Sequence, residues 1–247
     1  MTALRKPSAL SIADRVAAAD WKAIAADLDA RGAATTGPLF GPGECRALAA
    51  LYAEPAPGAT FRSRVVMARH GFGQGEYKYF SYPLPPPVAE LRQALYPRLA
   101  PVARRWHAAM GRAADLPDAL DGYLKRCHAA GQTRPTPLLL RYGAGDYNCL
   151  HQDLYGELAF PLQATILLSA SGADFSGGEF VLVEQRPRMQ SRPEVVPWRQ
   201  GEAVIFAVNE RPVAGKRGVY RVKMRHGVSR LLSGERLTLG IIFHDAK

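Results

Sequence analysis

Two histidines and one aspartate in the second half of the chain form a pattern that can bind a metal ion. His151 and Asp153 are separated by one residue, and His226 follows 73 positions after the aspartate. Two imidazoles and one carboxylate can occupy one face of Fe(II) and leave other positions open for a co-substrate and O2. Arg236, ten residues after His226, carries a planar guanidinium that can bind a carboxylate. The pattern predicts oxygen chemistry at iron with a carboxylate-bearing co-substrate.

The local sequence around the first two ligands predicts a geometry that suits one metal ion. Leu138–Tyr142 is a short apolar run typical of a buried strand, Gly143–Asp146 predict a turn, and Tyr147–Leu150 resume extended backbone. Side chains two positions apart on extended backbone point to the same side, as His151 and Asp153 would. Without this context, a packed strand histidine and a turn-initiating aspartate would explain the triplet equally well.

The second histidine lies in a segment that alternates polar and apolar residues. Tyr220–Val228 has the period of two that indicates a half-buried strand, and Arg236–Phe243 predicts another strand after a Ser233–Gly234 turn. We therefore expect His226 and Arg236 on neighbouring antiparallel strands. A hairpin would bring both side chains to one barrel mouth.

Three tyrosines are further candidates for the site. The Tyr142 hydroxyl can bind a carboxylate, although packing inside a barrel would also explain this residue. Tyr77 and Tyr79 lie in the glycine-rich segment 69–82, where glycines would give a substrate lid its mobility and a tyrosine would stack on a base. The same tyrosines also suit a β-hairpin arm with packed aromatic rings.

Several other polar residues near these motifs receive an interpretation. We interpret Cys149 as a small packing residue, because the three metal ligands are complete without it. Arg230 could reach a co-substrate carboxylate or a phosphate. His244 and Asp245 have the wrong spacing for metal ligands, and we expect them in a frayed C-terminus.

The order of the predicted elements indicates the fold class. Helices are predicted over 11–29, 45–52, 87–110 (with a kink at Pro97 or Pro101) and 117–128, and early strands over 33–40 and 61–68. Many short strands with glycine-rich turns follow. Helices before strands favour an α+β fold with a mainly β core, a double-stranded β-helix (jelly roll) buttressed by N-terminal helices. With 247 residues, 47% of them hydrophobic, we expect a single domain over 1–247, with helical support at about 10–130 and a catalytic core at about 136–246.

Cysteine usage and hydropathy indicate a cytoplasmic protein. No stretch approaches the roughly 18 apolar residues of a membrane span, and Met1–Pro7 has no apolar signal core. Cys45, Cys127 and Cys149 are odd in number and far apart, which favours reduced thiols. We expect no membrane contact, and no obligate protein partner is evident.

Positive charge is concentrated in the same half as the candidate ligands. The net charge is +10, and residues 184–230 hold eleven lysines and arginines against four acids. A basic surface favours polyanions such as nucleic acids through counterion release. Solubility or an arginine-rich genome would also explain the charge.

Five motifs resemble those of the 2-oxoglutarate/Fe(II) dioxygenase superfamily. They are HQD at 151–153, FSGGEF at 175–180, RQGEAVIF at 199–206, RHGVSRL at 225–231 and ERLTLGIIF at 235–243. Within that superfamily, RYGAGDYNCLHQD at 141–153 is similar to the metal-binding strands of bacterial AlkB-type nucleic-acid demethylases. The ten-residue step from His226 to Arg236 instead resembles prolyl-4-hydroxylase-like members.

The resemblance implies a set of roles and a reaction. His151, Asp153 and His226 would bind Fe(II), and Arg236 with Tyr142 would bind 2-oxoglutarate. With O2, the co-substrate would be converted to succinate while the substrate is hydroxylated. The implied substrate is an alkylated nucleic-acid base, demethylated in DNA repair.

Two other functional interpretations of the sequence remain open at this point. The first is a protein or peptide hydroxylase of the prolyl type, which the position of Arg236 favours. The second is a non-catalytic, cupin-like metal-binding module, which would not need Arg236. Zinc suits the pattern less well than iron, because a closed zinc site shows a fourth ligand or cysteines.

Overall fold

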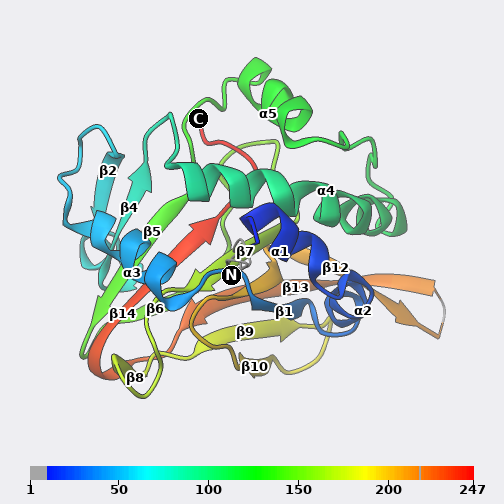
Figure 1. Ribbon diagram of the computed structural model, residues 1–247. Helices are drawn as coiled ribbons and strands as arrows, with labels where there is room; N and C mark the ends of the chain where they lie inside the picture. Colours follow the sequence, from blue (N-terminus) through cyan, green and yellow to red (C-terminus); the bar gives the residue numbers. More distant parts are fainter. Residues whose placement is uncertain (1–9, 217) are drawn as a thin grey trace, which may run out of the picture.

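Two antiparallel sheets form the body of the protein in a computed structural model that describes residues 10–216 and 218–247 (Figure 1). Met1–Pro7 and Arg217, which entered the expectations about a signal segment and basic charge, lie outside the described residues.

The larger sheet has the order β1 (Ala33–Pro38), β11 (Glu202–Ala207), β7 (Leu162–Leu167), β14 (Leu231–Ile241), β5 (Leu138–Gly143), β4 (Glu76–Phe80) and β2 (Phe61–Val66), with β8 (Phe175–Gly177) beside β14. The smaller sheet has the order β10 (Arg192–Val196), β9 (Phe180–Gln185), β13 (Gly218–Val228), β6 (Tyr147–His151) and β3 (Gly73–Gln74), with β12 (Glu210–Gly215) beside β13.

The helices gather on one side of the sheets, with α4 running across them and β9 and β10 on the opposite side (Figure 1). They are α1 (Ile12–Ala18), α2 (Trp21–Arg31), α3 (Pro42–Ala50), α4 (Pro86–Ala109) and α5 (Leu120–Ala129), with short 3-10 turns at Leu51–Ala53 and Met67–His70. The predicted mainly β architecture, with helices as a support, is therefore confirmed.

The first predicted helix is two helices. Ser11 and Asp14 form a capping box at the start of α1, while Ala19 adopts extended backbone and ends it. The Asp20 carboxylate then accepts a hydrogen bond from the Ala23 amide and starts α2. A second capping residue inside the apolar run therefore divides the helix, and hydrophobic spacing alone does not reveal such a break.

The strands that carry His226 and Arg236 are not neighbours, contrary to the sequence-based expectation. β13 pairs with β6, β9 and β12, whereas β14 pairs with β5, β7 and β8. The chain crosses between the sheets at Ser229 and Arg230, and the expected turn at Ser233–Gly234 lies inside β14, beside β8. His226 and Arg236 thus reach one cavity from opposite sheets.

The C-terminus is not frayed, and the interpretation of His244 and Asp245 was wrong. Both residues are fully buried. The Asp245 carboxylate pairs with Arg92 of α4 at 2.9 Å and accepts hydrogen bonds from Tyr82 and His128. The buried Arg92–Asp245 pair therefore fixes the segment after β14 to the helical layer. Among the described residues, no helix is long and apolar enough to cross a membrane.

Candidate metal and co-substrate site

The two histidines of the predicted triad lie opposite each other on adjacent strands. β6 and β13 are antiparallel, and His151 and His226 are partners in their register. Their ring centroids are 4.2 Å apart. Strand pairing therefore brings together two residues that are far apart in the sequence.

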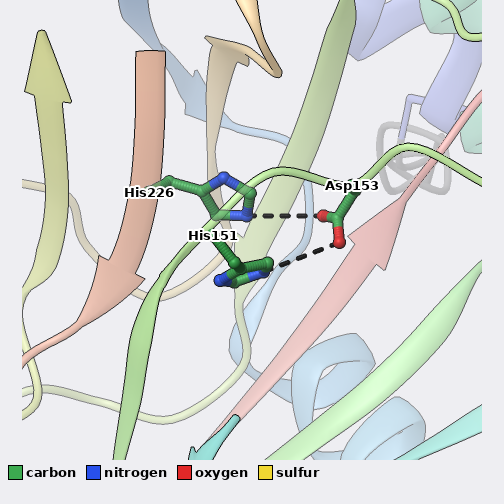
Figure 2. A group of neighbouring side chains, drawn as sticks. All are labelled: His151, Asp153 and His226. Atoms are coloured by element: carbon green, nitrogen blue, oxygen red, sulfur yellow. Dashed lines mark ion pairs between the residues drawn. The ribbon is translucent and has the colours of Figure 1, made fainter. Parts of the chain in front are cut away.

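Asp153 completes the group from just beyond the end of β6. Its Oδ2 lies 3.4 Å from His226 Nε2, and its Oδ1 lies 3.6 Å from His151 Nε2. Figure 2 shows both imidazole rings directed toward this carboxylate. One ligand atom from each residue lies within 4.8 Å of the other two, so the three can share one metal ion.

The His151 ring is oriented by its own strand. Its Nδ1 lies 2.8 Å from the Cys149 carbonyl oxygen, which can only accept a hydrogen bond, so Nδ1 carries the proton. In the neutral imidazole, Nε2 is then the nitrogen without a proton, and it faces the aspartate. This tautomer is the one that a metal ligand requires.

The electrostatics of the triad keep the aspartate ionised. Burial alone would raise the pKa of Asp153, but His226, His151 and the Tyr155 hydroxyl together hold that pKa well below its usual range. Burial and the neighbouring His151 lower the pKa of His226. At neutral pH the site therefore offers a carboxylate and an uncharged imidazole, the forms that bind divalent metals.

A cavity of about 340 Å³ lies between the sheets and contains the triad. Its walls come from both sheets, for example Thr165 and Thr238 from the larger and Phe180 and Val228 from the smaller. This volume falls in the range of small-molecule pockets. The space is large enough for a co-substrate beside the metal ligands.

Arg236 lines the same cavity and is 1% exposed. Its Nε and Nη1 have no hydrogen-bond partner among the described residues. Burial lowers the pKa of Arg236 to about 10, although Tyr142 and Glu179 partly oppose the effect. A buried guanidinium without a carboxylate partner is costly, and a bound anion would satisfy it.

Aromatic side chains hold the guanidinium of Arg236 in place. Its Cζ lies 5.5 Å from the centre of the Tyr142 ring and 5.6 Å from that of Trp198. Tyr142 is its register partner on β5, and the Tyr142 oxygen accepts a hydrogen bond from Asn148, so its own proton stays available. Gly178 has a φ of +65°, and a Cβ there would collide with Leu231 and lie 3.1 Å from the Arg236 side chain. The glycine therefore leaves room for the arginine.

The structure separates the two tyrosines of the 69–82 segment. Tyr77 lines the cavity. Tyr79 does not line it: the residue is 8% exposed, packs edge-on against Tyr77 at 5.3 Å and has the Arg62 guanidinium over its ring. Of the two, Tyr77 alone is placed to touch a bound molecule.

Two other expectations change with the structure. Cys149 was interpreted as a packing residue, but it is exposed and lines the cavity, two positions before His151 on β6. Arg230 is exposed on the connection between the sheets and does not line the cavity. Arg236 is therefore the arginine that the fold places inside.

Three cavity residues were missed by the sequence analysis. Tyr155 donates a hydrogen bond of 2.6 Å to Asp153. Gln163 is 5% exposed on β7, and its Oε1 has no partner among the described residues. Phe72 is 47% exposed at the mouth and stacks on His70. Tyr155 stands two positions after Asp153, and Gln163 is a long polar side chain in a strand that is apolar apart from Thr165, so both carried a signal.

The basic region 184–230 is only partly a charged surface. Arg211 is buried and bonds to Glu184, which also pairs with Arg186, while Lys223 pairs with Glu210 at 2.8 Å. Other members are exposed: Arg188, Arg199, Lys216, Arg225 and Arg230. Part of the charge excess therefore stabilises the fold, and the remainder is available to an anionic partner.

Comparisons with known proteins agree with this geometry. A family model described as "Oxygenase, catalysing oxidative methylation of damaged DNA" matches residues 75–246, well over half of the chain. Uncharacterized proteins from two strains of Mycobacterium tuberculosis are each 54% identical over 167 residues, covering 68% of this chain and 72% of theirs.

Solved structures share the fold at low sequence identity. A Pseudomonas putida prolyl-4-hydroxylase is 15% identical with a TM-score of 0.51, covering 92% of this chain and 100% of that one. A Burkholderia pseudomallei oxidoreductase of the 2OG-Fe(II) oxygenase family is 16% identical with a TM-score of 0.50, covering 98% and 96%. At these identities the likeness concerns the fold, and it confirms the predicted jelly roll.

Proposed function

This chain belongs to the Oxygenase-NA family and has the fold of the 2-oxoglutarate/Fe(II) oxygenases, and from this premise we propose that it removes methyl groups from alkylated nucleic-acid bases. The observation that carries the proposal is the match over residues 75–246 to a family described as acting on damaged DNA. An oxygenase adds oxygen to a C–H bond and transfers no methyl group. On a methylated base, the reaction that this chemistry supports is therefore methyl removal.

The residues present fit the iron and the co-substrate. His151, Asp153 and His226 would hold Fe(II), since two imidazoles and one carboxylate form the donor set of non-haem Fe(II) oxygenases. The unpartnered guanidinium nitrogens of Arg236 would bind the far carboxylate of 2-oxoglutarate, with the Tyr142 hydroxyl as a second donor. Iron with 2-oxoglutarate and O2 supplies the oxidation that hydroxylates the substrate and yields succinate and CO2.

The protein's own contribution is to orient the reactants and to exclude water. Arg236 fixes one end of the co-substrate, and the triad fixes the position of the metal. Phe180 and Phe206 pack around His226, at 6.0 and 4.6 Å between ring centroids, and keep the inner side of the site apolar. The substrate would then enter past the exposed mouth beside Phe72 and Tyr77.

The substrate reaction would proceed at an N-methyl group. Its hydroxylation gives an unstable hemiaminal, which releases formaldehyde and restores the base. A base within a duplex would first have to leave the stack. The exposed arginines of the 184–230 region support this proposal, because they could contact the phosphate backbone.

The test is to measure succinate and formaldehyde with Fe(II), 2-oxoglutarate and O2, with and without N-methylated single-stranded DNA. We expect DNA to stimulate succinate formation and formaldehyde to appear in equal amount. His151→Ala should abolish both products, while His107→Ala, in the last turn of α4 and outside the cavity lining, should not. If succinate formation did not change with DNA but increased with a proline-containing peptide, the peptide hydroxylase alternative would replace our proposal.

A further inference from the structure

The aspartate of the triad lacks the backbone support that its two histidine neighbours have. His151 and His226 belong to paired strands. Asp153 lies in the segment 152–161 between β6 and β7, which has neither helix nor strand. A residue outside the strand ladder needs other contacts to hold a fixed position.

Side chains supply those contacts around the irregular segment. Gln152 donates hydrogen bonds of 2.8 Å to the Asn209 side chain and to the Met224 carbonyl oxygen. Farther along, Gln132 bonds to both the amide and the carbonyl of Leu158. These bonds hold the backbone on each side of Asp153, but none of them reaches its carboxylate.

The carboxylate itself is held by Tyr155. The Tyr155 hydroxyl donates a hydrogen bond of 2.6 Å to Asp153 Oδ1, a length typical of a bond to an ionised oxygen. Oδ2 has no such hydroxyl donor among the described residues and faces His226 Nε2 at 3.4 Å, whereas Oδ1 lies 3.6 Å from His151 Nε2 in addition to its bond to Tyr155. The two oxygens of one carboxylate are thus in different environments.

Tyr155 is in turn kept in place by its surroundings. Its ring packs edge-on against Tyr79 at 6.3 Å and lies 6.1 Å from the His244 ring. The Arg62 guanidinium covers Tyr79 at 4.3 Å, and Arg62 Nε donates to the Pro135 carbonyl oxygen at 2.9 Å. Through these contacts Tyr79, on β4, supports the Tyr155 ring and so connects Asp153 to the larger sheet.

We propose that Tyr155 is a positioning residue that holds the Asp153 carboxylate so that Oδ2, and not both oxygens, serves the metal. The proposal rests on the metal site of the proposed function and assigns a role to a residue outside the triad. With Oδ1 engaged by Tyr155, the aspartate would take one coordination position. A second position would then stay open for co-substrate or O2.

The experiment is Co(II) binding to the metal-free protein, followed by visible absorption without co-substrate or substrate. Tyr155→Phe removes one hydroxyl and retains the ring. We expect its dissociation constant for Co(II) to rise by about tenfold. The spectrum at saturating Co(II) should also change, because a released carboxylate can bind through both oxygens.

The matched control is Tyr147→Phe, which loses a hydroxyl on the same strand as His151 but outside the cavity lining. It should keep the wild-type affinity and spectrum. Tyr155→Phe with wild-type affinity and spectrum would overturn the inference. So would a lower melting temperature of the metal-free variant with an unchanged Co(II) spectrum, since that result indicates a purely structural tyrosine. If the wild-type protein bound no Co(II), the proposed metal site would be refuted, and the inference about Tyr155 would be refuted with it.

Discussion

Arg92 and Arg236 are both 1% exposed, yet their surroundings are opposite. Arg92 bonds through Nε to the Ile242 carbonyl oxygen, through Nη1 to Tyr82 and through Nη2 to the Asp245 carboxylate, each at 2.9 Å. Among the described residues, Arg236 has two nitrogens without a partner, and the rings of Tyr142 and Trp198 lie beside its guanidinium. One buried guanidinium is fully satisfied by the protein, whereas the other is not.

The difference supports the proposal that Arg92 stabilises the fold and that Arg236 binds a ligand. Burying a charge without a partner costs free energy, so a site that keeps one has a use for it. The Arg236 nitrogens open toward a cavity that also contains three potential metal ligands. Burial alone therefore does not distinguish these two arginines, whereas unsatisfied bonding capacity beside a cavity does.

The largest effect on stability is expected from Arg92→Met. This change leaves Asp245 buried with only Tyr82 and His128 as partners. Breaking a buried ion pair in this way costs about 3–5 kcal/mol of unfolding free energy. Urea denaturation monitored by circular dichroism measures the loss. The double variant Arg92→Met/Asp245→Asn should recover part of it, and no recovery would contradict the pairing.

His244, the neighbour of Asp245 in the sequence, is a buried histidine whose titration should lower the stability of the protein in acid. Burial lowers the pKa of His244 to about 4. Between its ordinary value, 6.5, and about 4, the unfolded chain binds a proton that the folded chain does not, so stability falls as the pH drops through this window. The full effect is about 3 kcal/mol.

Replacing His244 should reduce the loss of unfolding free energy between pH 7 and pH 4. His244→Asn keeps an acceptor for the Phe160 amide, which now donates to Nδ1 at 3.1 Å. Urea titrations from pH 7 to pH 4 should show a smaller loss than in the wild type. The exposed His70→Asn is the control and should retain the wild-type slope. Equal slopes in wild type and His244→Asn would refute the assignment.

The sequence predicted which residues would lie together in one cavity better than it predicted the arrangement of the strands. His151, Asp153, His226 and Arg236 were recognisable because their chemical types and local extended backbone can be read within a few residues. The assignment of β13 and β14 to different sheets depends on pairing between distant segments, which periodicity does not report.

Burial was likewise difficult to predict where polar residues pair over long distances. Asp245 is buried because Arg92, 153 residues away, neutralises it. A rule that places polar residues near a chain end in solvent fails in such a case. The position of Tyr155, by contrast, followed the same two-residue spacing that linked His151 to Asp153, and could have been noticed.

Arg236→Met should separate ligand binding from stability. Losing the guanidinium removes the charge-assisted bonds to the far carboxylate, and we expect the dissociation constant for 2-oxoglutarate to rise by about 100-fold, or about 2.7 kcal/mol. The unfolding free energy without ligand should stay the same or increase, because an unpaired buried charge is removed. Calorimetric titration with Co(II)-loaded protein and urea denaturation provide the two readings. A marked loss of stability would place Arg236 with Arg92 as a structural residue.

Arg236→Lys tests whether charge alone is enough. A lysine keeps the positive charge, but it is a point donor and cannot form the planar pair of bonds to a carboxylate or lie flat between Tyr142 and Trp198. We expect an affinity for 2-oxoglutarate about tenfold below the wild type and above that of Arg236→Met. Wild-type affinity in the lysine variant would mean that a positive charge at this position is enough to bind 2-oxoglutarate. Affinity equal to that of the methionine variant would mean that the planar geometry provides the whole effect.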